Sequence, residues 1–264
     1  MEFYDLVKAA HFGIGVLALA TFWLSGLSRK GSPVHRASGK LYLLAMTGIL
    51  FSAAAMLPGF AERQHPVAAA FLGYLLVITG TGVWCSWRAI RDKHDWARYT
   101  GPVYKILMVL NGISGLATAY IGLFVTTRMQ LVFVAFSLIG ILGAIGMWRF
   151  ARQKPIDPRW WLKEHFGAMI GNGVATHIAF LSIGLPKLMP MLSGPLLQNL
   201  AWLGPLSLSV VAGIYLNRKY VPKRKTDTAS ATGSAASHSA APRSPGPRHG
   251  CASLRPPTPR RCAP

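Results

Sequence analysis

The stretch MQLVFVAFSLIGILGAIGMW occupies residues 129–148 and contains no charged residue. As a helix with a rise of ~1.5 Å per residue, it would extend about 30 Å, which matches the hydrocarbon thickness of a bilayer. Similar apolar runs recur along the chain, and the short alternating strands of a transmembrane barrel are not seen. The sequence therefore predicts a polytopic α-helical membrane protein.

Composition agrees with this fold class. Of the 264 residues, 52% are hydrophobic and 14% are charged, whereas soluble domains carry about 25% charged residues. The net charge of +20 is compatible with nucleic-acid binding. However, the basic residues lie between apolar segments, so we expect them to orient the chain in a membrane and expect no nucleic-acid partner. The three cysteines lack the spacing of a metal site or a disulfide framework.

We expect an all-α transmembrane bundle of about seven spans. The predicted helices are 4–27, 33–59, 66–90, 103–126, 129–149, 158–184 and 196–217. Ser32-Pro33 and Asp157-Pro158 each place an N-cap candidate before a proline that suits the first helical position. Glycines in the later helices, such as Gly140, Gly143 and Gly146, are expected to let neighbouring helices approach closely.

The charges between the spans alternate in a way that predicts topology. Basic residues gather in the first, third and fifth connections and after the last span, for example Arg29, Arg91 and Arg152. By the positive-inside rule, the N-terminus is outside and the C-terminus is cytoplasmic in the inner membrane. Most tryptophans fall at the predicted cytoplasmic helix ends, as in an interfacial belt.

Residues 221–264 differ in composition from residues 1–220. This segment is rich in Ala, Ser, Pro, Gly and Arg and has few large apolar residues. Such a sequence buries too little apolar surface to fold. We therefore predict a transmembrane domain over residues 1–220 and a disordered basic cytoplasmic tail over residues 221–264.

Four histidines are the candidate cofactor-binding residues: His11, His35, His165 and His177. An ionisable side chain in hydrocarbon is costly, so it marks a candidate functional site. Counted along the helices, His11 and His177 fall in the outer half of the membrane, and His35 and His165 in the cytoplasmic half. Two histidine pairs at two depths are typical of a protein with two b-type haems, and neutral imidazole also suits other metals. The spacing of 165 and 177 weakens this hypothesis, because they lie about 120° apart around a helix.

Two polar stripes leave other functions open. His165, Asn172 and Thr176 share one helical face, and Tyr104, Asn111 and Thr118 repeat this pattern on another helix. The ordinary interpretation is hydrogen bonding between helices. The alternative is a polar cavity for a quinone, a lipid headgroup or a proton relay, as in a transporter. Motifs of soluble catalysis are absent, so whether the protein is an enzyme stays open.

The segment from Val34 to Tyr42, VHRASGKLY, together with His11, resembles the HRxxGRxY signature of a family of bacterial multi-pass membrane proteins, catalogued as domain of unknown function 2306. The blocks HFGAMIG (165–171), ATHIAF (175–180) and AWLGP (201–205) are also similar to that family. The resemblance covers roughly residues 4–220, and Lys40 stands where the signature prefers Arg. It implies a bacterial integral membrane protein whose pattern includes His11, His35, Arg36, Gly39 and His165, without a substrate, cofactor or reaction.

Three classes of function therefore remain. The first is a redox protein that holds haem or another metal through the four histidines. The second is a transporter or a lipid- or quinone-binding protein that uses the same polar groups. The third is a structural or assembly subunit whose histidines only bond backbone carbonyls.

Overall fold

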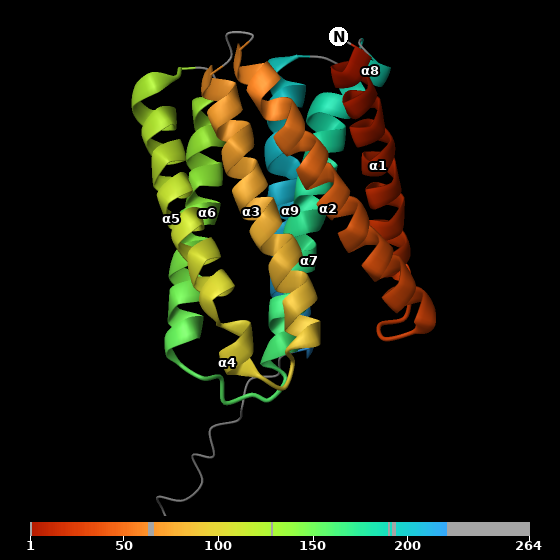
Figure 1. The fold of residues 1–264 in the computed structure, drawn as a ribbon, viewed down its shortest axis with the longest axis vertical. Coiled ribbons are helices and arrows are strands. Elements are labelled where there is room, and N and C mark those ends of the chain that lie inside the picture. Colours follow the sequence, from red (N-terminus) through yellow and green to blue (C-terminus); the bar gives the residue numbers. More distant parts are fainter. Residues whose placement is uncertain (1, 63–65, 128, 190, 192–193, 221–264) are drawn as a thin grey trace, which may run out of the picture. The chain divides into compact units, whose positions relative to one another are not determined.

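The computed structural model of the protein describes residues 2–62, 66–127, 129–189, 191 and 194–220. Within these ranges the chain is helical and contains no β-strand (Figure 1). The long helices are α1 (Glu2–Leu27), α2 (Pro33–Glu62), α3 (Pro66–Arg91), α5 (Pro102–Tyr120), α6 (Gln130–Arg152), α7 (Trp160–Ala179) and α9 (Pro195–Tyr220). The short elements are α4 (Trp96–Tyr99), α8 (Leu185–Leu188) and the π-helical segments η1 (Ile121–Val125) and η2 (Phe180–Gly184). The predicted all-α fold class is confirmed, and the predicted tail lies outside the described residues.

The two predicted N-caps have different outcomes. The side chain of Ser32 accepts a hydrogen bond from the backbone N–H of His35 at 3.1 Å, so the start of α2 at Pro33 is confirmed. The predicted start at Pro158 is wrong, because α7 begins at Trp160. Asp157 accepts from the N–H of Arg159 at 2.8 Å and, through its carbonyl, from Trp160 at 3.1 Å. These bonds close a turn that precedes the helix.

Six of the long helices are apolar enough to cross a membrane. They are α1, α2, α3, α5 continued by η1, α6 and α9. Helix α7 was also expected to be a span but is not among these six. It packs against α3, α9 and α1. Its polar residues Asn172 and Thr176 are buried. A hydropathy threshold counts such residues against a span, although buried side chains do not face lipid.

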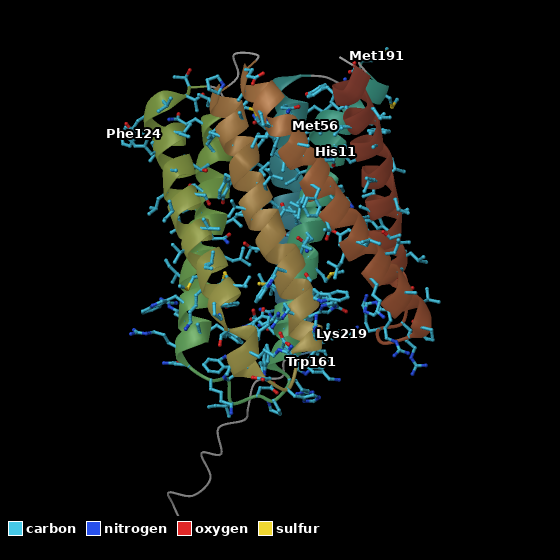
Figure 2. The ribbon with its side chains drawn as sticks, viewed as in Figure 1. His11, Met56, Phe124, Trp161, Met191 and Lys219 are labelled. Carbon is cyan, nitrogen blue, oxygen red and sulfur yellow. The ribbon has the colours of Figure 1, made fainter. Side chains whose placement is uncertain are left out.

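The outer surface of the bundle is apolar. Large side chains are exposed on most of the long helices, including Phe51 (74% exposed) on α2 and Leu131 (62%) on α6. Phe124, near the end of α5 and η1, is 75% exposed and points away from the helices (Figure 2). A continuous surface of this kind is typical of contact with lipid tails rather than water.

Helices α3 and α7 occupy the centre of the described bundle. α3 contacts α2, α5 and α7, whereas α1 packs mainly on α2, and α5 mainly on α6. Aromatic side chains fill the contact between α3, α6 and α9: Phe71 stacks on Phe133 with ring centroids 4.5 Å apart, and Trp202 lies 5.5 Å from Phe71. Residues from α3 and α7 therefore have the best access to partners on several helices.

The connections at residues 28–32, 92–101 and 153–159 lie at the same end of the bundle (Figure 1), which we call the basic end. They belong to the segments in which the sequence concentrates Lys and Arg. Trp161 and Lys219 are also found at this end (Figure 2). The alternation of basic connections is therefore visible in the fold, although which side of the membrane they face stays a prediction.

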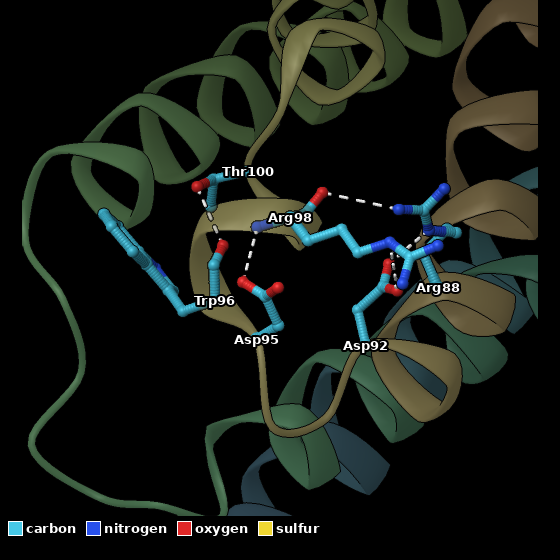
Figure 3. A network of polar contacts seen from close by, with 6 residues as sticks. All are labelled: Arg88, Asp92, Asp95, Trp96, Arg98 and Thr100. Atoms are coloured by element: carbon cyan, nitrogen blue, oxygen red, sulfur yellow. Dashed lines mark hydrogen bonds and ion pairs between the residues drawn. The ribbon is translucent and has the colours of Figure 1, made fainter.

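A buried carboxylate organises the connection between α3 and α5. Asp92 has a fully buried side chain that forms ion pairs with Arg88, on the last turn of α3, and with Arg98 at 3.5 Å (Figure 3). Asp95 caps α4 by accepting from the backbone N–H of Arg98 at 2.9 Å. Arg88 and Arg98 belong to the basic residues that we expect to orient the chain in the membrane. They thus also neutralise a buried charge.

Candidate functional site

His35 lies in the first turn of α2, at the basic end. Its Nδ1 atom is 3.0 Å from the carbonyl oxygen of Ser25, on the last turns of α1. The same Nδ1 atom is 3.2 Å from Oγ of Ser25. A carbonyl oxygen can only accept, so in the tautomer that bonds this carbonyl Nδ1 carries the proton and Nε2 keeps its lone pair. Nε2 has no hydrogen-bond partner among the described residues.

Lys30 lies beside this histidine. Its Nζ atom donates to the same carbonyl of Ser25 at 3.2 Å and to that of Gly26 at 2.6 Å. Partial burial lowers the pKa of Lys30. The C-terminal carbonyls of α1 are thus bonded by one ammonium and one imidazole, which fixes the position of His35 relative to α1.

His165 repeats the arrangement of His35 on another helix. It lies on α7, is partly buried, and its Nδ1 atom is 3.0 Å from the carbonyl oxygen of Ser86 on α3. Nδ1 is again the donor, so Nε2 is again a free acceptor with respect to the described residues. His35, in the first turn of α2, and His165, in the second turn of α7, both lie towards the basic end. That they share a ligand stays a prediction.

His11 lies towards the opposite end of the bundle, between α1 and α2 (Figure 2). Its Nδ1 atom is 2.8 Å from Oγ of Ser52. Ser52 donates its own hydroxyl proton to the carbonyls of Gly48 and Ile49. Ser52 therefore accepts from His11, and this contact holds α1 against α2 without a second histidine.

The expected pairing of His11 with His177 is wrong. His177 accepts a hydrogen bond at Nε2 from the indole N–H of Trp23 at 3.0 Å, and its Nδ1 atom is 2.7 Å from the carbonyl of Gly173. Trp23 and His11 are on the same helix, and their separation of 12 residues corresponds to about 18 Å at ~1.5 Å per residue. α7 meets α1 where Phe22 covers Gly173, so His177 lies level with the last turns of α1.

The polar stripe on α7 forms hydrogen bonds to neighbouring helices. Asn172 donates from Nδ2 to Oγ of Ser86 at 3.3 Å, and Thr176 is 3.0 Å from the hydroxyl of Tyr42 on α2. The Oδ1 atom of Asn172 is buried without a hydrogen-bond partner among the described residues, against Gly82 on α3. The stripe therefore joins α7 to both α2 and α3.

The stripe on α5 is bonded in the same manner. Asn111 donates from Nδ2 to Oγ1 of Thr81 on α3 at 2.7 Å, and the hydroxyl of Tyr104 donates to the carbonyl of Met147 on α6 at 3.4 Å. Sequence analysis missed the partners on α3, Thr81 and Ser86, because a threonine and a serine five residues apart form no helical stripe. These bonds agree with the ordinary interpretation of the stripes as contacts between helices.

The described residues contain no group of three or more His, Cys, Asp or Glu side chains that could share a metal ion. A ligand held by histidine at the basic end would therefore have two imidazoles from the protein, His35 and His165. His11 is remote from them, and His177 has both nitrogens engaged. The candidate site is thus smaller than the four-histidine site expected from the sequence.

The fold and the apolar surface define the class of this protein: it is a multi-pass α-helical membrane protein in contact with the lipid bilayer. No protein-family model matches the chain, and no curated protein or solved structure matches it. The resemblance of Val34–Tyr42 to the family of domain of unknown function 2306 stays a prediction.

Proposed function

We propose that this membrane protein holds one redox cofactor at its basic end, with Nε2 of His35 and Nε2 of His165 as the ligands. The observation that supports this is the bonding of both Nδ1 atoms to backbone carbonyls. Histidines that bind metals usually donate their other ring N–H to a carbonyl or carboxylate, which fixes the ring and raises the basicity of the binding nitrogen. With the proton on Nδ1, both rings would meet this requirement.

A b-type haem is the cofactor that best suits two neutral imidazoles from two helices, because its iron takes two axial nitrogens. When bound, haem would supply one-electron chemistry. His35 and His165 would hold it between α2 and α7, and Lys30 would place a positive charge nearby. One haem is proposed rather than two, because His11 and His177 are not brought together.

The test is the absorbance spectrum and metal content of the purified protein. We expect a haem band, or another metal in stoichiometric amount, in the unsubstituted protein and in His177→Ala. We expect its loss in His35→Ala and in His165→Ala. A protein that is folded, free of haem and free of metal would end this proposal.

The second candidate is binding of a quinone or another small molecule by the same two imidazoles. The specific observation in its favour is that Lys30 donates to the same Ser25 carbonyl as His35. Its ammonium would donate to a carbonyl of the ligand, while the Nε2 atoms accept from hydroxyl groups. Extraction of a quinone from the purified protein, in an amount that falls in His35→Ala, would favour this candidate. Unchanged cellular activity of both histidine variants would instead favour a structural or assembly subunit.

We also propose that the protein belongs to the family of domain of unknown function 2306 and resides in the bacterial inner membrane, with its N-terminus outside. The supporting features are the Val34–Tyr42 segment and the basic connections at one end of the bundle. Reporter fusions test the orientation.

A further inference from the structure

A second polar site lies among α5, α6 and α7. A cavity of about 440 Å³ opens there near the basic end, and its walls include Tyr104, Met147, Phe150, Lys163 and Glu164. Tyr104 is buried, Glu164 is partly buried and Lys163 is exposed. The cavity therefore carries one carboxyl group and one ammonium group on walls that are otherwise apolar or aromatic.

Glu164 is only partly satisfied by the protein. The hydroxyl of Tyr99 donates to its Oε2 atom at 3.3 Å. Burial raises the pKa of Tyr99, so this phenol keeps the proton that it donates. The Oε1 atom has no hydrogen-bond partner among the described residues, and the carboxylate lines the cavity. A carboxylate in this setting is expected to accept from a cationic donor that enters the cavity.

The rings of Tyr104 and Phe150 line the cavity together with Glu164, and they belong to a larger aromatic cluster. The ring of Tyr99 lies 5.2 Å from that of Tyr104 and 5.0 Å from that of Trp160, and Phe150 lies 5.6 Å from Trp160. Aromatic faces attract ammonium groups through their quadrupoles, and a nearby carboxylate adds to the attraction. The part of the cavity beside Glu164, Tyr104 and Phe150 thus suits an ammonium group.

The other lining residues of the cavity suit a phosphate and an acyl chain. Lys163 supplies a positive charge beside Glu164 on the first turns of α7. On α6, Gly143 and Gly146 line the cavity, and a Cβ atom built on either would meet nothing within 4 Å. From Phe150 back to Gly143 the helix rises about 10 Å at ~1.5 Å per residue, so this open face runs from the basic end into the apolar layer.

From this geometry we propose that the cavity binds a zwitterionic phospholipid whose headgroup carries a primary ammonium. The ammonium is held by Glu164 and the aromatic rings of the cavity, the phosphate by Lys163, and one acyl chain lies along Gly143 and Gly146. A primary ammonium can donate hydrogen bonds to the free Oε1 atom, which a quaternary ammonium cannot. The site shares no residue with His35 and His165, so it does not depend on the proposed redox function.

Lipid retention by the purified full-length protein tests the proposal. The protein is reconstituted in nanodiscs with phosphatidylethanolamine, phosphatidylcholine or phosphatidylglycerol, re-extracted, and examined by native mass spectrometry for bound lipid. We expect phosphatidylethanolamine to be retained in preference to the other two. Glu164→Gln should weaken its retention about ten-fold, the size expected for loss of one charge-assisted hydrogen bond.

Filling the open face of α6 gives an independent variant. Gly146→Leu should also reduce retention, because its side chain would occupy the path of the acyl chain. Two variants serve as matched controls. Glu62→Gln changes an exposed carboxylate at the last residue of α2, away from the basic end. Gly13→Leu changes a glycine on α1 with equally open surroundings. Both controls should retain phosphatidylethanolamine as the unsubstituted protein does.

Three results would overturn the proposal. The first is equal retention of the three lipids by the unsubstituted protein. The second is preferential retention of phosphatidylglycerol or phosphatidylcholine. The third is unchanged retention in both Glu164→Gln and Gly146→Leu, with gel filtration showing that both variants are folded.

Discussion

The imidazole of His165 donates from Nδ1 to the backbone carbonyl of Ser86, at 3.0 Å, across the contact between α7 and α3. A backbone carbonyl cannot be removed by substitution of Ser86, so this bond survives changes of the serine side chain. The bond fixes the ring and leaves Nε2 directed away from its partner. The proposed cofactor site depends on this relationship and on its counterpart between His35 and Ser25.

The tautomer of His165 is the first prediction. In a sample at about pH 8, where imidazoles are ordinarily neutral, ¹⁵N-histidine spectra of the protein without a bound metal should show His165 protonated at Nδ1. The assignment is made by loss of the signal in His165→Ala. The exposed His94 serves as the control, because no carbonyl fixes its ring in the structure. A signal from His165 with the proton at Nε2 would contradict the hydrogen bond to Ser86.

The glycines of α6 give a second prediction. A Cβ atom at Gly140 would lie 2.9 Å from the backbone oxygen of Asn111 and 2.9 Å from the hydroxyl of Tyr74. We expect Gly140→Ala to lower the free energy of unfolding by about 1–3 kcal/mol, the usual cost of overpacking. Thermal or denaturant unfolding in detergent micelles measures this change.

Gly143→Ala is the matched control on the same helix. Its Cβ atom would meet nothing within 4 Å, so the stability should be unchanged or slightly higher because Ala favours helix more than Gly does. Equal losses in the two variants would show that α5 and α3 do not approach Gly140 as the structure has them.

These glycines also show how far sequence reasoning reaches. The spacing of Gly140, Gly143 and Gly146 predicts a close helix contact, but only Gly140 makes one. Gly82 and Gly173, which sequence analysis did not single out, are covered closely by Asn172 and Phe22. Small residues indicate where helices can approach, whereas the partner that approaches depends on the rotation and crossing of both helices.

The helices themselves were predictable because length and apolarity determine them. The predicted span 33–59 is observed as Pro33–Glu62, and the predicted span 66–90 as Pro66–Arg91.

The prediction that His11 pairs with His177 was wrong for a different reason. Depth counted along isolated helices assumes that they are level and parallel, but α7 meets α1 near Phe22, which places His177 beside Trp23. Helix offsets arise from tertiary packing and have no local sequence signal.

The third prediction concerns the buried carboxylate of Asp92. Asp92→Asn would leave the charges of Arg88 and Arg98 without their common partner. Breaking a fully buried pair costs ~3–5 kcal/mol, but the side chain of Arg98 is 60% exposed. After allowance for solvent screening we expect a loss of about 1–3 kcal/mol in the free energy of unfolding.

Asp157→Asn is the control for this change. Asp157 pairs with Arg159 at 3.6 Å, and both side chains are largely exposed, at 45% and 58%. Its replacement should change the stability by less than about 0.5 kcal/mol, as for most surface pairs. Unfolding experiments in the same detergent compare the two variants. Equal stability of Asp92→Asn and Asp157→Asn would contradict this prediction. It would mean that water replaces Asp92 as the partner of Arg88 and Arg98.

The fourth prediction is that α7 crosses the membrane although its sequence is less apolar than that of the other long helices. It carries Glu164, His165, Asn172 and His177, and each of these side chains bonds a group on a neighbouring helix. A hydrogen bond to a neighbouring helix lowers the cost of placing a polar side chain inside the membrane. Hydropathy alone therefore underestimates such a helix.

Reporter fusions on both sides of α7 decide this point. By the positive-inside rule, alkaline phosphatase fused after Gln153 should be inactive because it stays in the cytoplasm. Fused after Gly194 it should be active, and fused after Tyr220 it should be inactive again. Reporters after Gln153 and Gly194 that gave the same activity would place both ends of α7 on one side. In that case α7 would not cross the membrane. It could then not place His165 against Ser86 or His177 against Trp23, because both contacts are made with spanning helices.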